Sequence, residues 1–163
     1  MKQLLFTACL LFLVAPSSFS QAPDVQSLAG LSGVTVAFQS FPEKLEHDGL
    51  TMKQIGVEAE LRLRKAGIKV LSLDEAMKSS GSPVLEIKIE AVKSEELYAV
   101  SIRIRFLQKV TTERKPNVLT HSATWERATV MIVGTAKLRE VKNEVGDGVD
   151  LFANDFLTAN PKN

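Results

Sequence analysis

The chain lacks most of the residue types on which disulfide-stapled domains and thiol or metal enzymes depend. Its 163 residues include one cysteine, one tryptophan, one tyrosine and two histidines. A single cysteine excludes an intrachain disulfide, so hydrophobic packing has to hold the fold together. The 20 basic and 19 acidic side chains leave a formal net charge of +1. Because nucleic-acid-binding proteins usually carry a basic excess, this balance predicts no nucleic-acid partner.

The first 20 residues have the pattern of a secretory signal peptide. Lys2 provides a positive start, the run Leu4–Ala15 is uncharged, and Ser18 and Ser20 place small residues where a signal peptidase reads them. We therefore expect this segment to be cleaved, after Ser20 or Ala22. The run is shorter than the roughly 20 apolar residues of a membrane-spanning helix. The pattern thus predicts an exported chain with no transmembrane span.

The only cysteine lies inside that segment, in a stretch, Phe6–Cys9, that superficially resembles a lipobox. A cut before Cys9 would leave only Leu4–Ala8 as the apolar core of the signal, which is too short. We therefore expect no lipid anchor. The remaining chain has no Asn-x-Ser/Thr glycosylation acceptor. These absences favour a bacterial envelope protein, with the periplasm as its predicted location and secretion as the alternative.

Cleavage after Ser20 would leave a chain of ordinary single-domain size. Residues 21–33 are small and polar and predict a flexible lead-in, while residues 34–163 predict one α+β domain. β-branched or alternating apolar residues predict five strands, over 34–41, 68–73, 84–92, 97–110 and 123–133. Residues 111–122 between the last two strands predict a polar loop. In the last strand apolar residues occur in both phases, so its facing is ambiguous.

Two segments have the three- and four-residue spacing of amphipathic helices. The first spans 50–66, with Thr51 as a predicted N-cap and Gly67 as its stop. The second runs from Leu138 to about residue 159. Gly146 and Gly148 interrupt it, for close packing on the sheet or for a kink.

The alternation in strands 84–92 and 97–110 predicts a hairpin that turns at residues 93–96. One face would be apolar and the other charged. This hairpin would place three pairs of residues opposite one another: Ile89 and Val100, Ile87 and Ile102, and Glu86 and Arg103. The complete order predicts a two-layer α+β sandwich, in which about five mostly antiparallel strands carry two helices on one face.

A helix–Gly–Ile–x–Val turn at Leu61–Val70, long alternating strands and a closing helix with Phe152 and Phe156 before Asn160-Pro161 carry a resemblance. The chain resembles small exported bacterial proteins of unknown function. Its layout is also similar to the amino-terminal domain of the TolB periplasmic protein and to small envelope-assembly lipoproteins. Those families bind other envelope proteins and are not enzymes, so the resemblance implies a protein-binding role.

Motifs for chemistry are missing from the sequence. His47 and His121 have no metal-ligand spacing, and the aspartates at 147, 150 and 155 do not form a calcium loop. We therefore predict no metal, no cofactor and no enzyme activity. A small hydrolase or ligand-binding enzyme remains the alternative, and it would need a pocket around His121, Glu126 and Arg127.

The leading hypothesis is a non-enzymatic accessory or protein-binding domain of the cell envelope. Its partner would be another envelope protein or, in a third hypothesis, a second copy of itself. The contact would use an exposed sheet face or an open sheet edge, or a second apolar surface on the first helix. The candidate surface residues are Glu86, Lys88, Arg103 and Arg105 on the charged strand face, Trp125 and Arg127, and Val57 and Leu61 on the helix.

Overall fold

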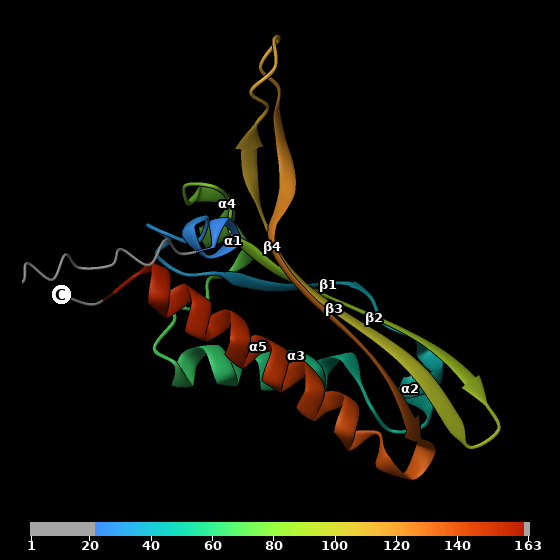
Figure 1. The fold of residues 1–163 in the computed structure, drawn as a ribbon. Coiled ribbons are helices and arrows are strands. Elements are labelled where there is room, and N and C mark those ends of the chain that lie inside the picture. The colour runs from blue at the N-terminus through green and yellow to red at the C-terminus, as the bar shows by residue number, and fades with distance from the viewer. Residues whose placement is uncertain (1–21, 162–163) are drawn as a thin grey trace, which may run out of the picture.

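The computed structural model describes residues 22–161, so the predicted signal peptide lies outside the described residues. This part of the chain is an α+β fold with one four-stranded mixed sheet (Figure 1). In chain order its elements are α1 (Pro23–Gln26), β1 (Thr35–Ser40), α2 (Glu43–His47), α3 (Met52–Lys65), α4 (Leu73–Lys78), β2 (Val84–Ser94), β3 (Leu97–Thr111), β4 (Leu119–Gly134), the 3-10 helix η1 (Thr135–Lys137) and α5 (Arg139–Ala159).

The sheet has the order β1-β2-β3-β4. β1 is parallel to β2, whereas the β2–β3 and β3–β4 pairs are antiparallel. The predicted strand over 68–73 is therefore wrong, because the only pairing there is a single bridge between Val34 and Val70. Helix α4 ends the extended segment early. Ser72 and Glu75 form a capping box, which starts that helix directly after Leu71.

The predicted β2–β3 hairpin forms, with its faces as expected but its register two residues away. Ile89 pairs with Ile102 rather than with Val100, and Glu86 pairs with Arg105 rather than with Arg103. The two-residue turn at Glu95-Glu96, with a positive φ at Glu95, is tighter than the predicted four-residue turn. Side chains alternate with a period of two, so a shift of this size leaves each residue on its predicted face.

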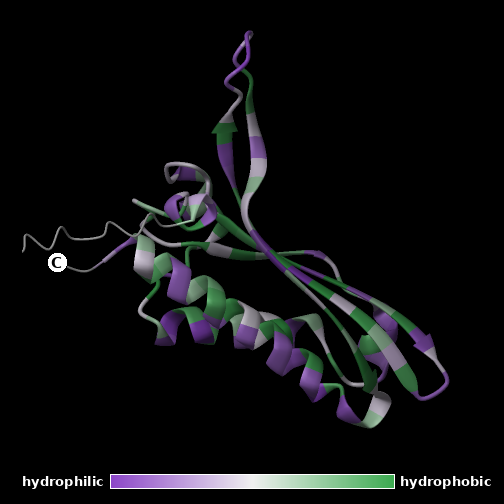
Figure 2. Ribbon diagram, in the orientation of Figure 1, coloured by the Kyte–Doolittle hydropathy of each residue, from purple (hydrophilic) through white to green (hydrophobic). Residues whose placement is uncertain are grey.

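The predicted polar loop over 111–122 is confirmed for residues 112–118, whereas Thr111 and residues 119–122 belong to strands. β3 and β4 stay paired as far as Thr111 and Leu119, and together they form an arm that projects from the body of the molecule (Figure 1). The arm consists of residues 109–122, and hydrophilic residues dominate its tip (Figure 2). Polar side chains hide this strand pair in the sequence, because neither face of the arm packs on a core.

Helices α3 and α5 cover one face of the sheet (Figure 1). The Thr51 hydroxyl accepts a hydrogen bond from the Gln54 backbone N–H at 3.2 Å, which confirms the predicted N-cap of α3. Gly67 follows that helix with φ +78°. In α5, a β-carbon at Gly148 would lie 2.6 Å from Cδ1 of Ile104. Glycine thus lets α5 approach β3 closely, which is the first of the two roles expected for it.

The core lies between the sheet and these two helices. Phe152 of α5 is fully buried and contacts three other rings, with centroid distances of 5.7 Å to Phe106, 5.1 Å to Trp125 and 6.1 Å to Phe156. The Trp125 indole N–H donates a hydrogen bond to Asp155 at 2.8 Å, so its one polar group is paired. This aromatic cluster joins α5 to both β3 and β4.

Residues 22–33, expected to be a flexible lead-in, pack against the end of α5. Leu28 of this segment is fully buried. The Asn160 side chain donates to the Leu28 carbonyl at 2.8 Å and accepts from the Gly30 N–H at 2.7 Å. The two ends of the described chain are therefore held together. Within residues 22–161, no helix has the length and apolar character needed to cross a bilayer.

Replacement of Phe152 by alanine is expected to lower the free energy of unfolding by about 3–5 kcal/mol, because the cavity left behind borders three rings. Urea unfolding followed by circular dichroism measures the change. Leu151→Ala is the matched control: its side chain is 53% exposed, and we expect a loss of less than about 1 kcal/mol. Equal losses for the two variants would contradict this view of the core.

Candidate functional site

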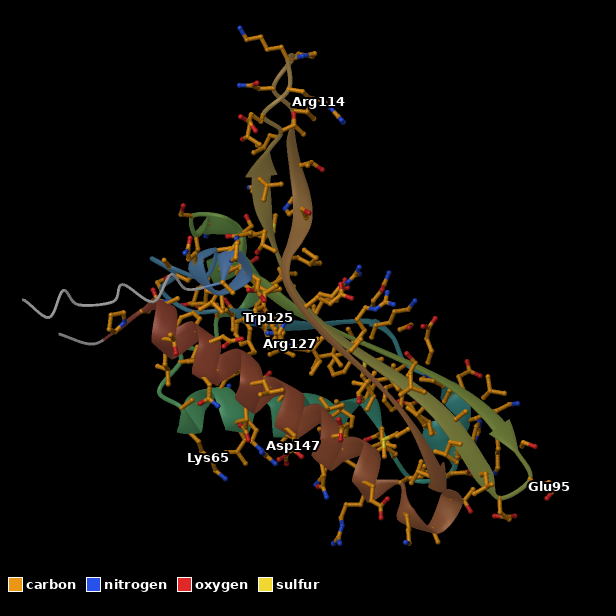
Figure 3. The ribbon with its side chains drawn as sticks, in the orientation of Figure 1. Lys65, Glu95, Arg114, Trp125, Arg127 and Asp147 are labelled. Atoms are coloured by element: carbon orange, nitrogen blue, oxygen red, sulfur yellow. The ribbon has the colours of Figure 1, made fainter. Side chains whose placement is uncertain are left out.

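The structure divides the predicted surface residues among three places. The sheet face that α3 and α5 leave uncovered, here called the outer face, carries Glu86, Lys88, Arg103 and Arg105. Trp125 and Arg127 lie on the opposite, helix-covered side, close to α5 (Figure 3). Val57 and Leu61 lie on α3, where they are 59% and 42% exposed. Residues 22–161 therefore do not gather them into one surface.

The charges of the outer face pair with one another. Three ion pairs lie on this face: Arg105 with Glu86 at 2.5 Å and Arg103 with Glu126 at 3.4 Å join neighbouring strands, and Lys88 with Glu90 at 2.9 Å lies within β2. Each positive group has a negative partner, so the band offers little unpaired charge to a binding partner. Such partly exposed pairs contribute about 1 kcal/mol or less each. This region is best explained as a solvated face.

Trp125 and Arg127 have a structural role in holding α1 and α5 to β4. Trp125 is 1% exposed. The Arg127 guanidinium lies 4.9 Å from the Trp125 ring centroid and forms ion pairs with Asp24 at 3.3 Å and Asp155 at 3.5 Å. Both side chains are thereby engaged within the fold, so the predicted hot-spot pair is not a free contact surface.

One long side of β4 carries backbone groups that no other strand of residues 22–161 binds. The Thr135 N–H donates to the Glu96 carbonyl at 3.0 Å, and the register is regular from there to Phe106 and Trp125. Antiparallel partners alternate between hydrogen-bonded and non-hydrogen-bonded pairs. The N–H and C=O groups of Ala128, Val130 and Ile132 therefore point away from β3. We call Ala128–Val133 the β4 edge.

The β4 edge has none of the features that usually prevent edge strands from pairing. It contains no charge and no proline, and no bulge interrupts its pairing with β3. Val130 is 76% exposed and Ile132 is 74% exposed. Sequence reasoning missed this site, although its signal was present. When apolar residues occupy both alternating sets of positions in a strand, one set faces the core and the other faces solvent.

The exposed side chains of this edge continue across the sheet as an apolar patch on the outer face. Val92, Ala99 and Ile132 lie side by side on β2, β3 and β4. Val92 is 72% exposed, and Leu97, two residues before Ala99 on the same face of β3, is 53% exposed. Contiguous exposed apolar side chains are typical of protein-interaction sites. The β4 edge therefore borders a surface suited to a second protein.

On the helix-covered side, a small groove separates β4 from α5. It has a volume of about 160 Å³, a floor that includes Ile102, Ile104 and Gly148, and a rim that includes Arg127, Glu144 and Asp147. Small-molecule sites usually measure about 300–1,000 Å³. The groove is thus better sized for side chains of a segment lying along β4 than for a separate ligand.

The pocket expected for an enzyme does not form around His121, Glu126 and Arg127. His121 is exposed on the arm, Glu126 lies on the outer face with Arg103, and Arg127 lies on the helix-covered side. Successive strand residues point to opposite faces, which is why neighbours at 126 and 127 separate. Residues 22–161 also contain no group of three or more His, Cys, Asp or Glu side chains that could hold a metal ion.

The side chains of Asp48 and Tyr98, near the turn of the β2–β3 hairpin, have shifted pKa values. The Lys93 ammonium, 2.7 Å from Asp48, and the Tyr98 hydroxyl, also 2.7 Å away, hold the pKa of Asp48 below its ordinary value. Burial, followed by its bond to Asp48, raises the pKa of Tyr98. These contacts fasten the turn after α2 to the hairpin. Asp48 also borders a pocket of about 370 Å³, whose lining includes Gln54, Arg139 and Lys142.

No protein-family model, curated protein or solved structure matches the chain. The candidate site therefore rests on the geometry of the β4 edge.

The ion pair at Asp48 predicts a pH dependence of stability. Because the folded-state pKa of Asp48 is lowered, its contribution is present above the unfolded value of about 3.9 and is lost as pH falls through the folded pKa. Asp48→Asn should therefore destabilise the protein near pH 6, and the difference from the wild type should shrink below about pH 4. Thermal unfolding between pH 2 and 6 measures it.

Lys93→Gln removes the same ion pair from the other side and should show the same narrowing over the same pH range. A difference between wild type and either variant that stays constant down to pH 2 would contradict the assignment.

Proposed function

We propose that this protein is a non-enzymatic protein-binding domain of the bacterial cell envelope, and that it binds an extended segment of a partner protein by strand addition to the β4 edge. The observation that carries the proposal is the uncharged edge Ala128–Val133, with its outward backbone groups and the exposed side chains of Val130 and Ile132. Strand addition uses main-chain hydrogen bonds for affinity and side-chain positions on the two faces for specificity.

The surroundings of the edge define the chemistry of the partner segment. A strand beside β4 would alternate between the apolar patch at Val130 and Ile132 and the groove beside Thr129 and Leu151. Apolar or β-branched residues fit both rows. Charged residues on the outer-face side of the segment, beside Val130 and Ile132, would lose water without gaining an ion partner. The expected ligand is therefore a short extended segment with an uncharged, apolar centre.

The envelope location is supported by the signal-like first 20 residues and by the resemblance to small exported proteins that bind envelope partners. The absence of disulfide chemistry agrees with a domain that is held by its core alone.

A second copy of the chain is the other candidate partner, and the edge itself favours it. If two β4 strands pair antiparallel about Val130, Ala128 lies opposite Ile132 and Glu126 lies opposite Gly134. No like charges face each other in this arrangement, and the apolar patches of the two copies become continuous. A symmetric dimer with an eight-stranded sheet would result.

The decisive variant is Val130→Pro. The Val130 N–H points away from β3, so proline removes no bond within the sheet but blocks strand addition. A photo-cross-linking residue at Ala128, in a tagged copy expressed in the source cell, would report what lies beside the edge. We expect one envelope protein to be captured repeatedly, and Val130→Pro to reduce its yield at least tenfold.

Val130→Thr is the matched control, since it keeps the N–H and the β-branched shape. It should retain the cross-link at close to the wild-type yield. Adducts of twice the chain's own mass that Val130→Pro abolishes would assign the edge to self-association instead. If no adduct forms, or if proline leaves the yield unchanged, the β4 edge is not the binding site.

A further inference from the structure

The arm formed by residues 109–122 serves no purpose in the packing of the body. The Lys109 N–H donates to the Gly81 carbonyl at 2.7 Å, and beyond this point the two strands contact each other rather than the core. Lys109 lies opposite His121, and Thr111 lies opposite Leu119. The arm points away from both sheet and helices (Figure 1). Its side chains are thus available to something outside the chain.

The arm carries a positive charge that the rest of the fold does not neutralise. Lys109, Arg114 and Lys115 face a single acid, Glu113, and none of the four forms an ion pair within residues 22–161. Elsewhere in those residues acidic side chains outnumber basic ones. Arg114 lies near the end of the arm (Figure 3). The fixed charges of the protein are therefore unevenly distributed, and the arm is its positive end.

Two apolar side chains accompany these cations. Val118 is 50% exposed and Leu119 is 67% exposed, and both follow directly on the loop that holds Arg114 and Lys115. The Val118 carbonyl accepts a hydrogen bond from the Thr112 N–H at 3.0 Å, so the arm presents these side chains on a formed hairpin. Exposed aliphatic residues beside unpaired cations are complementary to a surface that carries negative charge outside and has an apolar layer directly beneath it.

We propose that the arm binds the surface of a membrane rich in anionic phospholipid. Arg114 and Lys115 contact the headgroup phosphates, Lys109 adds long-range attraction, and Val118 and Leu119 enter the boundary between headgroups and acyl chains. An acidic protein would satisfy the cations but would leave the two aliphatic side chains in water. The lipid surface uses all five residues, which is why it is the assigned partner.

This role is separate from strand addition. A bulge between Phe106 and Leu107 divides the arm from the regular part of the sheet, and the β4 edge lies on the far side of that bulge. The membrane contact would place the body near the bilayer with its edge free for a protein. Each surface can therefore fail its own test without affecting the other.

The test is co-sedimentation of the purified protein with vesicles of phosphatidylcholine containing 30% phosphatidylglycerol, at low and high salt. We expect binding to these vesicles and none to phosphatidylcholine alone. Each cation near the surface changes binding about fivefold, so Arg114→Gln with Lys115→Gln should weaken binding more than tenfold. Val118→Ser with Leu119→Ser should weaken it as well, with the salt dependence retained.

The matched control is Lys65→Gln with Arg139→Gln, which removes two exposed cations from the helices and should leave vesicle binding unchanged. Circular dichroism checks that the variants stay folded. Val130→Pro, which alters the β4 edge and not the arm, should bind vesicles as the wild type does. The proposal is overturned if anionic vesicles do not bind, if the arm and control variants weaken binding equally, or if the protein binds soluble polyglutamate but not vesicles.

Discussion

The packing of α5 against β3 and β4 is the constraint on which the rest of the structure depends. Phe152 places its ring among Phe106, Trp125 and Phe156, while Gly148 lets the helix backbone come close to Ile104. This contact buries one face of a sheet in a chain whose described part has no disulfide. Helix α3 lies beside α5, and both helices pack an apolar side on that one face of the sheet. The other face and the long side of β4 are consequently left to solvent.

The two edges of the sheet differ for a physical reason. β1 is short, and a bridge from Val34 to Val70 and the turn into α4 shield its start. β4 is 16 residues long, and the shielding contacts to α1 reach it only near Thr124 and Arg127. Ala128–Val133 stays uncovered by residues 22–161. Because unprotected apolar edges favour association, this edge is the basis of the proposed strand addition.

Many charged side chains of the body pair with one another, whereas those of the arm do not within residues 22–161. On the outer face, arginine, lysine and glutamate side chains satisfy one another in cross-strand and neighbouring pairs. Arg62 of α3 does the same, since it pairs with Glu58 on its own helix and with Asp150 on α5. The arm is different, since its cations have no partners within the described chain. Paired charges stabilise or solubilise the fold, whereas unpaired ones on a projecting hairpin are free to attract an anionic surface.

Local pattern in the sequence determined much of the secondary structure and its facing. The capped helix after Thr51, the closing helix through Phe152 and the alternation of β2 and β3 all follow from spacing of apolar residues, which acts within a few residues along the chain. The α+β class with helices on one face followed from these elements. Even the wrong hairpin register kept every side chain on its correct face, because the error was two residues.

Only the tertiary structure decided which strands meet and what they leave exposed. Whether residues 68–73 pair fully, whether 111–122 is a loop or an arm, and whether Trp125 is free or buried depend on contacts between distant segments. Those contacts are set by total burial and geometry rather than by local spacing. For the same reason, the exposed β4 edge was not identified from the sequence. An apolar residue looks alike in sequence whether it packs in a core or faces water, and only the folded chain shows which faces were covered.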